Sequence, residues 1–213
     1  MKVALLAGGT GLIGSQLLQL LIMDEAYGTI KCLTRNELPI SNSKIEVIHT
    51  NGDNLAELAS SLTADDVFCC LGTTIKKAKS KEAFRKIDFD YPLNLAKVSK
   101  AGGAKQFLLI SALGADPSSS VFYNKVKGEV EEAIAEVGFE GYHIFRPSLL
   151  LGERAEERSG EDAAKIFFKL FGFLVPGKYK AIDSSKVARA MVAKAKLSEM
   201  GTSVSESKVL QSF

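Results

Sequence analysis

Short apolar segments alternate with longer helical patterns from the start of the chain to about residue 150, and this order limits the possible folds. Six segments have the apolar or β-branched character of strands: residues 2–8, 29–34, 44–50, 65–72, 105–114 and 141–148. Helical patterns lie between and after them, at residues 12–23, 53–62, 80–100, 119–137, 162–174 and 184–197. Because parallel strands need long crossover connections, this order predicts an α/β fold, a doubly wound parallel sheet with helices on both faces.

The same pattern predicts a single domain over residues 1–213, since no linker rich in Pro, Gly or Ser divides the chain. Residues 149–183 and the polar C-terminal tail are expected to form a small cap, with a short strand at residues 208–211. Within the helical pattern at residues 80–100, Pro92 is expected to kink or interrupt the helix.

The composition argues against several classes of function. A net charge of +2 gives no electrostatic case for binding nucleic acid, and the basic cluster at residues 76–86 is local. No apolar run approaches the roughly 20 residues that cross a bilayer, and glycines interrupt the start of the chain where a signal peptide would be continuous. The three cysteines lack metal-site spacing, so we expect no metal, reduced thiols and a cytoplasmic location.

A glycine-rich turn, AGGTGLIG at residues 7–14, directly follows the first predicted strand and opens the first helix. In this context glycines allow close approach of a dinucleotide pyrophosphate, and the helix N-terminus supplies free N–H groups and a positive dipole end. The alternative is a glycine-rich turn that binds nothing. The residues expected to contact the cofactor here are Gly8, Thr10, Gly11, Leu12, Ile13 and Gly14.

The end of the second predicted strand indicates which dinucleotide is bound. About 20 residues after the glycine turn, NAD sites place an acidic residue that binds the ribose 2′-hydroxyl. This chain has Arg35 there instead, which favours NADP(H) over NAD(H), although a solvated cation at the end of a strand is the other interpretation. Asp53 follows the third strand and is placed either to bind the adenine amine or to cap the helix predicted at residues 53–62.

A tyrosine and a lysine four residues apart lie on the helix predicted at residues 119–137. On a helical wheel, Tyr123 and Lys127 share one side at the edge of the apolar stripe, whereas Glu131 falls on the opposite face. Alone, the two would be explained as a half-buried Tyr and a Lys paired with Glu131. Ser111 ends the preceding strand, however, and the carboxyl ends of strands in an open α/β sheet face the ligand crevice.

Taken together, the glycine turn, Ser111 and the Tyr-x-x-x-Lys pattern resemble the short-chain dehydrogenase/reductase superfamily, whose NAD(P)-binding domain has the Rossmann fold. CCLGTTI at residues 69–75 and YNKVKGEV at residues 123–130 are more specific and resemble an atypical subgroup. FRPSLLLG at residues 145–152 matches a stretch that borders the nicotinamide in extended and atypical members. The resemblance covers about residues 2–198, and one position departs from it: Asp88 stands where many members have Asn.

The resemblance implies a catalytic site made of Ser111, Tyr123 and Lys127. Tyr123 would donate a proton, Lys127 would favour its ionised form and bind the nicotinamide ribose, and Ser111 would hold the substrate oxygen. It also implies cofactor contacts by Tyr123 and Lys127 and by residues after the fourth and sixth strands: Leu71, Gly72, Thr73, Arg146 and Pro147.

The activity implied by the resemblance is reduction of a small carbonyl compound by hydride transfer from NADPH. Apolar residues at 166–174 favour an apolar aldehyde or ketone if they line the crevice, and core packing is the other interpretation. Two other functions stay open: an NADPH-sensing protein with little or no turnover, and an epimerase or dehydratase that holds its cofactor tightly. The resemblance leaves the oligomeric state open between a monomer and a homodimer.

Overall fold

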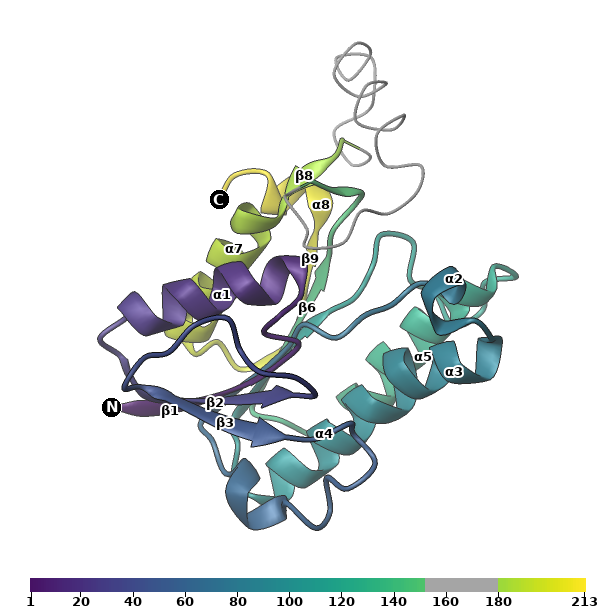
Figure 1. The fold of residues 1–213 in the computed structure, drawn as a ribbon. Helices are drawn as coiled ribbons and strands as arrows, with labels where there is room; N and C mark the ends of the chain where they lie inside the picture. The colour runs from purple at the N-terminus through teal and green to yellow at the C-terminus, as the bar shows by residue number, and fades with distance from the viewer. Residues whose placement is uncertain (152–179) are drawn as a thin grey trace.

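A parallel sheet of seven strands forms the centre of the protein in a computed structural model that describes residues 1–151 and 180–213 (Figure 1). The strands follow the order β3-β2-β1-β4-β5-β6-β9. Their bounds are β1 (Lys2–Ala7), β2 (Tyr27–Thr34), β3 (Ile45–His49), β4 (Asp66–Cys69), β5 (Gln106–Ile110), β6 (Gly141–Arg146) and β9 (Gly201–Glu206). The order reverses between β1 and β4, which is the switch point where open α/β sheets bind ligands. The predicted doubly wound sheet is confirmed.

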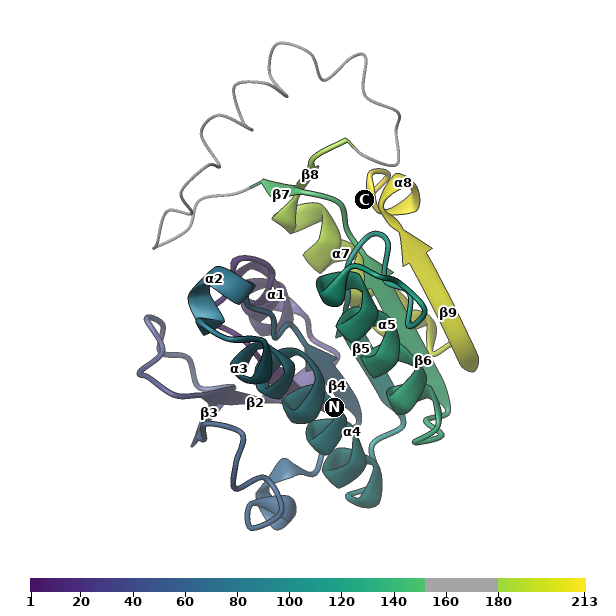
Figure 2. The same cartoon turned by 90° about the vertical axis from the view of Figure 1, so that its right-hand side faces the viewer.

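Helices cover both faces of this sheet (Figures 1 and 2). One face carries α1 (Leu12–Met23) and α7 (Ser184–Leu197), which pack against each other. The other carries α3 (Lys81–Arg85), α4 (Tyr91–Ala101) and α5 (Phe122–Ala135). Because both faces are covered, the central strands β4 and β5 are buried at every position, and the inner strands appear in the sequence as apolar runs.

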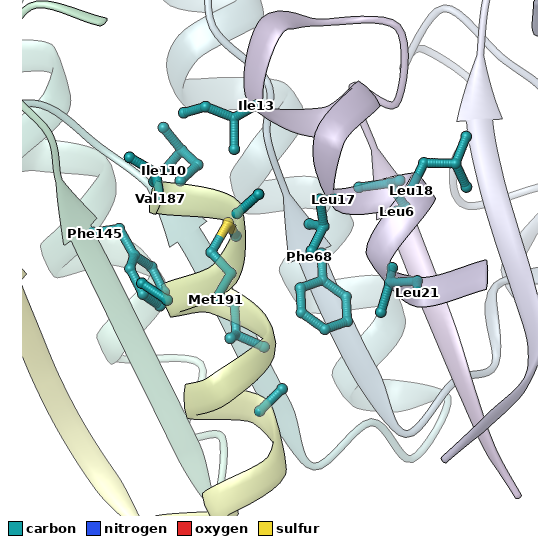
Figure 3. Packing of buried hydrophobic residues seen from close by; sticks show 14 of the residues in the cluster. Leu6, Ile13, Leu17, Leu18, Leu21, Phe68, Ile110, Phe145, Val187 and Met191 are labelled. Atoms are coloured by element: carbon teal, nitrogen blue, oxygen red, sulfur yellow. The ribbon is translucent and has the colours of Figure 1, made fainter. Parts of the chain in front are cut away.

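Two hydrophobic clusters form the core, one on each face of the sheet. Figure 3 shows the first, in which Leu6 and Phe68 from the strands pack against Leu17 of α1 and Met191 of α7. Leu5, the neighbour of Leu6, belongs to the second cluster beneath α4 and α5. Successive strand residues point to opposite faces, so one apolar strand supplies both clusters.

Residues 81–101 form a helix with a widened turn in the middle. Between α3 and α4 lies the π-helical turn η2 (Lys86–Asp90), in which the N–H of Tyr91 donates to the carbonyl of Lys86. Pro92 follows directly in the first turn of α4. A proline in a regular helix lacks an N–H and clashes with the carbonyl four residues earlier, so a wider turn accommodates it. The interruption predicted at Pro92 is therefore a π turn.

Two local predictions are wrong. Residues 53–62 do not form an α-helix: they form turns followed by the 3-10 turn η1 (Ala59–Leu62). There the Thr50 hydroxyl donates to Asn54 and the Asn51 amide donates to Asp53, local bonds that compete with helix formation. The strand predicted at residues 208–211 is instead the short helix α8 (Ser207–Leu210).

The C-terminal tail contributes a strand to the main sheet, contrary to the expectation that it joins a cap. Strand β9 pairs in parallel with β6 from Gly141↔Gly201 to Arg146↔Glu206. It is an edge strand and only Ser205 of its residues is buried, so it lacks the apolar alternation that would have revealed it.

Most of the predicted cap, including the helix expected at residues 162–174, lies outside the described residues. Its ends are described: β7 (Leu150–Leu151) and β8 (Ile182–Asp183) pair in parallel. One further element, the short helix α2 (Ile75–Ala78), has no counterpart in the sequence-based prediction. Among residues 1–151 and 180–213, no helix combines the length and apolarity needed to cross a membrane.

Candidate cofactor and catalytic site

The glycine turn brings the ends of β1 and β4 into close backbone contact. Gly8 has φ +86°, and a Cβ on it would lie 2.7 Å from the carbonyl oxygen of Cys70. A Cβ on Gly14 would lie 2.0 Å from the carbonyl oxygen of Gly8, so α1 can approach the turn only with glycine there. Packing alone therefore requires glycine at these two positions.

The start of α1 adds a feature that packing does not explain. Its N-cap residue is Gly11, no side chain caps the helix, and its first turn contains no acidic residue. The first amides of a helix have no partner within the helix, and they normally receive a side-chain cap, water or a ligand. The uncapped amides of Leu12, Ile13 and Gly14 and the positive end of the helix dipole therefore fit a dinucleotide pyrophosphate.

The residues expected on the adenosine side lie on loops after β2 and β3. Arg35 is exposed directly after β2. Its positive charge is one of the smaller effects on the pKa of Tyr91, which lies at the start of α4, and it acts to lower that pKa. Burial first of all raises the pKa of Tyr91 to about 12. The ring of Tyr91 packs against Gly52, whose Cβ would lie 2.7 Å from it. Tyr91 was not expected here, because three strands separate its helix from the glycine turn in the sequence.

Asp53 makes an ion pair with Lys86, and 2.7 Å separates its Oδ1 from the Lys86 Nζ. Both side chains are more than half exposed, which limits the strength of this pair. The suggestion that Asp53 caps a helix is wrong, because no α-helix begins there. A contact with the adenine amine stays a prediction.

Lys127 is almost completely buried and is paired with Asp88. Its side chain is 3% exposed, that of Asp88 is 0% exposed, and 2.8 Å separates Nζ from Oδ1. Burial lowers the pKa of Lys127, but the charges of Asp88 and Tyr123 more than offset this, so the pKa is raised overall. The alternative explanation, a lysine paired with Glu131, is wrong: the partner is Asp88 of the π turn, 39 residues earlier in the chain.

Glu131 is also buried, although the helical wheel placed it on the exposed face. It accepts a hydrogen bond of 3.0 Å from Nε of Arg146 and a second one from the same guanidinium. Arg146 also pairs with Glu206 of β9 at 3.4 Å. These partners raise the pKa of Arg146, the hydrogen bond to Glu131 most of all. Arg146 thus ties β6 to α5 and to β9, and a contact with the nicotinamide stays a prediction.

The loop after β4 rests on the Asp88–Lys127 pair. The N–H of Thr73 donates to Oδ2 of Asp88 at 2.9 Å. A Cβ on Gly72 would lie 3.7 Å from Asp88 Oδ1 and 4.0 Å from Lys127 Nζ. The loop that was expected to line the cofactor therefore lies beside the predicted catalytic lysine. It consists of Leu71, Gly72 and Thr73.

Ser111 follows β5 at the carboxyl edge of the sheet and is 4% exposed. Its N–H donates to the carbonyl of Phe145 at 2.8 Å, while its Oγ has no hydrogen-bond partner within residues 1–151 and 180–213. Nearby, the N–H of Leu113 donates to the carbonyl of Pro147 at 3.0 Å, which ties the loop after β5 to the Arg-Pro stretch. A buried hydroxyl without a partner is rare and calls for an explanation.

Tyr123 is half-buried in the first turn of α5, and its ring centroid lies 5.6 Å from that of Phe84 in α3. An ion pair between Arg85 and Glu129 also joins α3 to α5. Tyr123 and Lys127 lie one turn apart on α5, and the charge of Tyr123 is one of the effects that raise the pKa of Lys127. Within the described part of the chain, no cluster of three His, Cys, Asp or Glu side chains could hold a metal ion.

A family model described as NAD(P)H-binding matches residues 8–198 of this chain. The chain belongs to this NAD(P)H-binding family. The match spans the glycine turn, the loop after β4 and helices α5 and α7, so the family pattern includes the regions described above.

Named relatives support the same assignment. Protein HTATIP2 of Rattus norvegicus is 39% identical over 78% of this chain and 70% of its own length. Protein FMP52, mitochondrial, of Candida albicans is 35% identical over 87% of this chain and 84% of its own length. The resemblance to atypical short-chain dehydrogenases/reductases is thereby confirmed. Several of the fungal relatives are named mitochondrial, so the expectation of a strictly cytoplasmic location finds no support in them.

Solved structures confirm the fold at low sequence identity. A UDP-N-acetylglucosamine 4-epimerase from Methanobrevibacter ruminantium has a TM-score of 0.75 at 18% identity, over 96% of this chain and 76% of that one. MoeE5, solved with UDP-glucose and NAD, has a TM-score of 0.74 at 17% identity, over 94% of this chain and 74% of that one. At such identity the likeness shows a shared Rossmann-type fold and nothing about substrate.

Proposed function

We propose that this protein is an NADPH-dependent oxidoreductase that reduces a small, apolar carbonyl compound at a site formed by Ser111, Tyr123 and Lys127. The buried, unpartnered hydroxyl of Ser111 is the observation that carries the proposal. It lies at the carboxyl edge of the sheet, where a substrate oxygen would give it the partner it lacks.

The cofactor is held by the uncapped start of α1, the glycine turn and the loop after β4. The exposed guanidinium of Arg35 suits a 2′-phosphate, which favours NADPH over NADH. Bound there, the reduced nicotinamide supplies a hydride. An affinity for NADPH at least tenfold weaker than that for NADH would overturn the assignment of NADPH.

The residues of the chain supply the remaining steps. Ser111 Oγ–H donates a hydrogen bond to the carbonyl oxygen, which stabilises the negative charge that develops on it. As the carbonyl carbon gains a hydride and is reduced, Tyr123 Oη transfers its proton to the carbonyl oxygen. The product is an alcohol, and Tyr123 regains a proton from solvent. Lys127 binds the nicotinamide ribose hydroxyls and holds positive charge near Tyr123.

The test combines direct NADPH binding with NADPH consumption across a panel of aldehydes and ketones of increasing apolar size. We expect binding together with turnover that improves with apolar substituents. The matched variant Tyr123→Phe keeps the ring and its packing on Phe84 but removes the proton donor. Unchanged turnover in this variant would remove Tyr123 from the mechanism.

A second function, an NADPH-sensing protein with little turnover, is favoured by one observation. The charge of Lys127 is compensated by a buried carboxylate, which weakens its effect on a neighbouring tyrosine. NADPH binding without turnover on any compound of the panel would select this function over the first.

A further inference from the structure

Asp88 connects two parts of the site from the middle of the π turn. Its carboxylate is 0% exposed. Oδ2 accepts a hydrogen bond of 2.9 Å from the N–H of Thr73, and Oδ1 lies 2.8 Å from Lys127 Nζ. A fully buried carboxylate is strongly unfavourable unless it is paired and hydrogen-bonded. Here Oδ2 is hydrogen-bonded, whereas Oδ1 has the ion pair with Lys127 but no hydrogen-bond partner within residues 1–151 and 180–213.

The π turn explains how Asp88 reaches this position. The N–H of Tyr91 donates to the carbonyl of Lys86, five residues earlier, so the turn that contains Asp88 is wider than a regular helical turn. π turns inside α-helices occur frequently at functional sites. α5 packs directly against η2, and α3 and α5 lie side by side in Figure 2.

The ionisable groups that act on Lys127 come from three elements. Asp88 of η2, Tyr123 of α5 and Cys69 of β4 all affect its pKa. Burial raises the pKa of the Cys69 thiol to about 11, so this thiol is neutral at physiological pH. Two further ion pairs involve α5, and in each the charges offset each other: Arg85 of α3 pairs with Glu129, and Arg146 of β6 pairs with the buried Glu131. Of the groups that act on Lys127, the Asp88 carboxylate is the one in direct contact with its ammonium.

We propose that Asp88 is a positioning residue that keeps the Tyr123–Lys127 pair fully protonated up to alkaline pH, and so extends the pH range in which Tyr123 donates a proton. An adjacent carboxylate stabilises the ammonium form of Lys127 and disfavours an anionic Tyr123, and both effects oppose loss of the first proton. An Asn at this position would exert neither effect. The effect of Asp88 on protonation does not depend on the proposed function. Only its predicted consequence for turnover rests on that function.

The consequence follows from the balance of the reaction. Reduction moves a hydride to the carbonyl carbon and a proton from Tyr123 to the carbonyl oxygen, so it requires Tyr123 in its protonated form. The alkaline limb of a pH–rate profile reports loss of that proton. With Asp88 present this limb lies at higher pH than it would with a neutral residue.

The direct test uses Asp88→Asn without cofactor or substrate. The amide oxygen of Asn can still accept from Thr73, so the change removes the charge and keeps the loop contact. NMR of protein labelled at tyrosine Cζ and lysine Cε follows both members of the pair, with the Tyr123 signal assigned from its loss in Tyr123→Phe. We expect the first proton of the pair to leave at least about one pH unit lower than in the native protein.

Asp90→Asn is the matched control, because it removes an exposed carboxylate two residues away on the same helix. We expect it to leave both titrations in place, since exposed charges are screened by solvent. An unchanged first titration in folded Asp88→Asn, or an equal shift in Asp90→Asn, would overturn the inference.

The native protein provides a measurement that does not depend on the variant folding. If Asp88 acts as proposed, neither the Tyr123 nor the Lys127 signal changes with pH below about pH 9. Loss of a proton from either residue below that pH would contradict the inference even if Asp88→Asn cannot be purified.

Turnover separates this inference from the proposed function. In the presence of NADPH and an active substrate, Asp88→Asn should move the alkaline limb of kcat to lower pH by the same amount as the NMR titration. If the native protein has no turnover but the NMR shift is present, the proposed function fails and the role of Asp88 stands. If turnover is present and neither the limb nor the titration moves, the role of Asp88 fails and the proposed function stands.

Discussion

Two buried carboxylates lie at opposite ends of strand β4 and have different kinds of partner. Asp66 opens the strand at the amino edge of the sheet, is 1% exposed, and accepts hydrogen bonds from Tyr27 at 2.7 Å and Gln106 at 2.7 Å. Its cationic partner, Lys2, is 36% exposed. Asp88 lies beyond the other end of β4, and its cationic partner is a lysine at 3% exposure.

The difference separates a structural carboxylate from a functional one. Asp66 accepts hydrogen bonds from neutral donors, and the lysine that compensates its charge keeps contact with water. This network joins β1, β2, β4 and β5. Asp88 and Lys127 enclose two full charges at the edge where the glycine turn and Ser111 lie. Buried ion pairs contribute little net stability, so such a pair at a cofactor edge indicates a role in chemistry.

The largest expected effect comes from comparing two Tyr→Phe variants, one at each edge of the sheet: Tyr123→Phe at the carboxyl edge and Tyr27→Phe at the amino edge. Tyr123→Phe should lower turnover by about 10²–10⁴-fold, because it removes the proton donor, and should leave NADPH binding unchanged. Steady-state kinetics and NADPH titration provide the measurement.

Tyr27→Phe is its counterpart at the amino edge. It removes the hydroxyl that donates to Asp66, so it should lower the free energy of unfolding by about 1–3 kcal/mol and leave turnover per folded molecule unchanged. An equal loss of turnover in Tyr27→Phe and Tyr123→Phe would contradict the conclusion that the amino edge has only a structural role.

Asp66→Ala is expected to have the next largest effect, and on stability alone. It removes the acceptor of the Tyr27 hydroxyl and one acceptor of the Gln106 amide, which keeps its bond to the carbonyl of Ala195. We expect a loss of about 3–5 kcal/mol in the free energy of unfolding. Urea denaturation measures this loss. NADPH affinity measured on the folded fraction should match that of the native protein, and a weakened affinity would show that the amino edge also serves the cofactor.

The sequence was informative where one segment of chain carries the whole signal. The apolar run at residues 2–8 and the glycine turn after it predicted β1, α1 and the uncapped helix start, because burial on both faces leaves a continuous pattern. The positions of Tyr123 and Lys127 on one side of α5 followed from helical periodicity. Contacts between distant segments leave no such pattern.

The features that were missed in the site and in the sheet depend on distant contacts. The alternative explanation of Lys127 was a pair with Glu131 on its own helix, but Lys127 pairs with Asp88, and Glu131 pairs with Arg146 of β6. A helical wheel cannot show that a neighbouring strand buries the polar face of α5. Strand β9 was missed for a related reason: its pairing with β6 stabilises a segment whose side chains are mostly exposed.

Arg35 tests the adenosine end of the site, with a smaller effect. Arg35→Ala should weaken NADPH binding by about tenfold or more and leave NADH binding unchanged, because a charged hydrogen bond to a 2′-phosphate contributes about 1.5–3 kcal/mol. Fluorescence titration of both cofactors measures the ratio. Lys44→Ala, which removes a cation from the amino side of the neighbouring strand β3, is the control and should change neither affinity. An equal loss for both cofactors would mean that Arg35 does not distinguish them.

The smallest expected effect concerns His143, a buried residue of β6 whose Nδ1 lies 2.8 Å from Ser203 Oγ of β9. Burial, followed by the charge of Lys194, lowers the pKa of His143, while Glu199 and Asp66 act in the opposite direction. A histidine with a lowered pKa in the folded state binds its proton more readily when unfolded, so the stabilising contribution is present above about pH 6.5 and is lost as the pH falls through the folded-state pKa. We expect the free energy of unfolding to fall by less than about 1 kcal/mol on acidification from pH 7 to pH 5 through His143. His143→Gln should remove this contribution from the slope of the free energy of unfolding against pH. Because the charges that act on His143 are those of Lys194, Glu199 and Asp66, Asp88→Asn should leave this part of the slope unchanged, which would assign this pH sensitivity to β6 and β9.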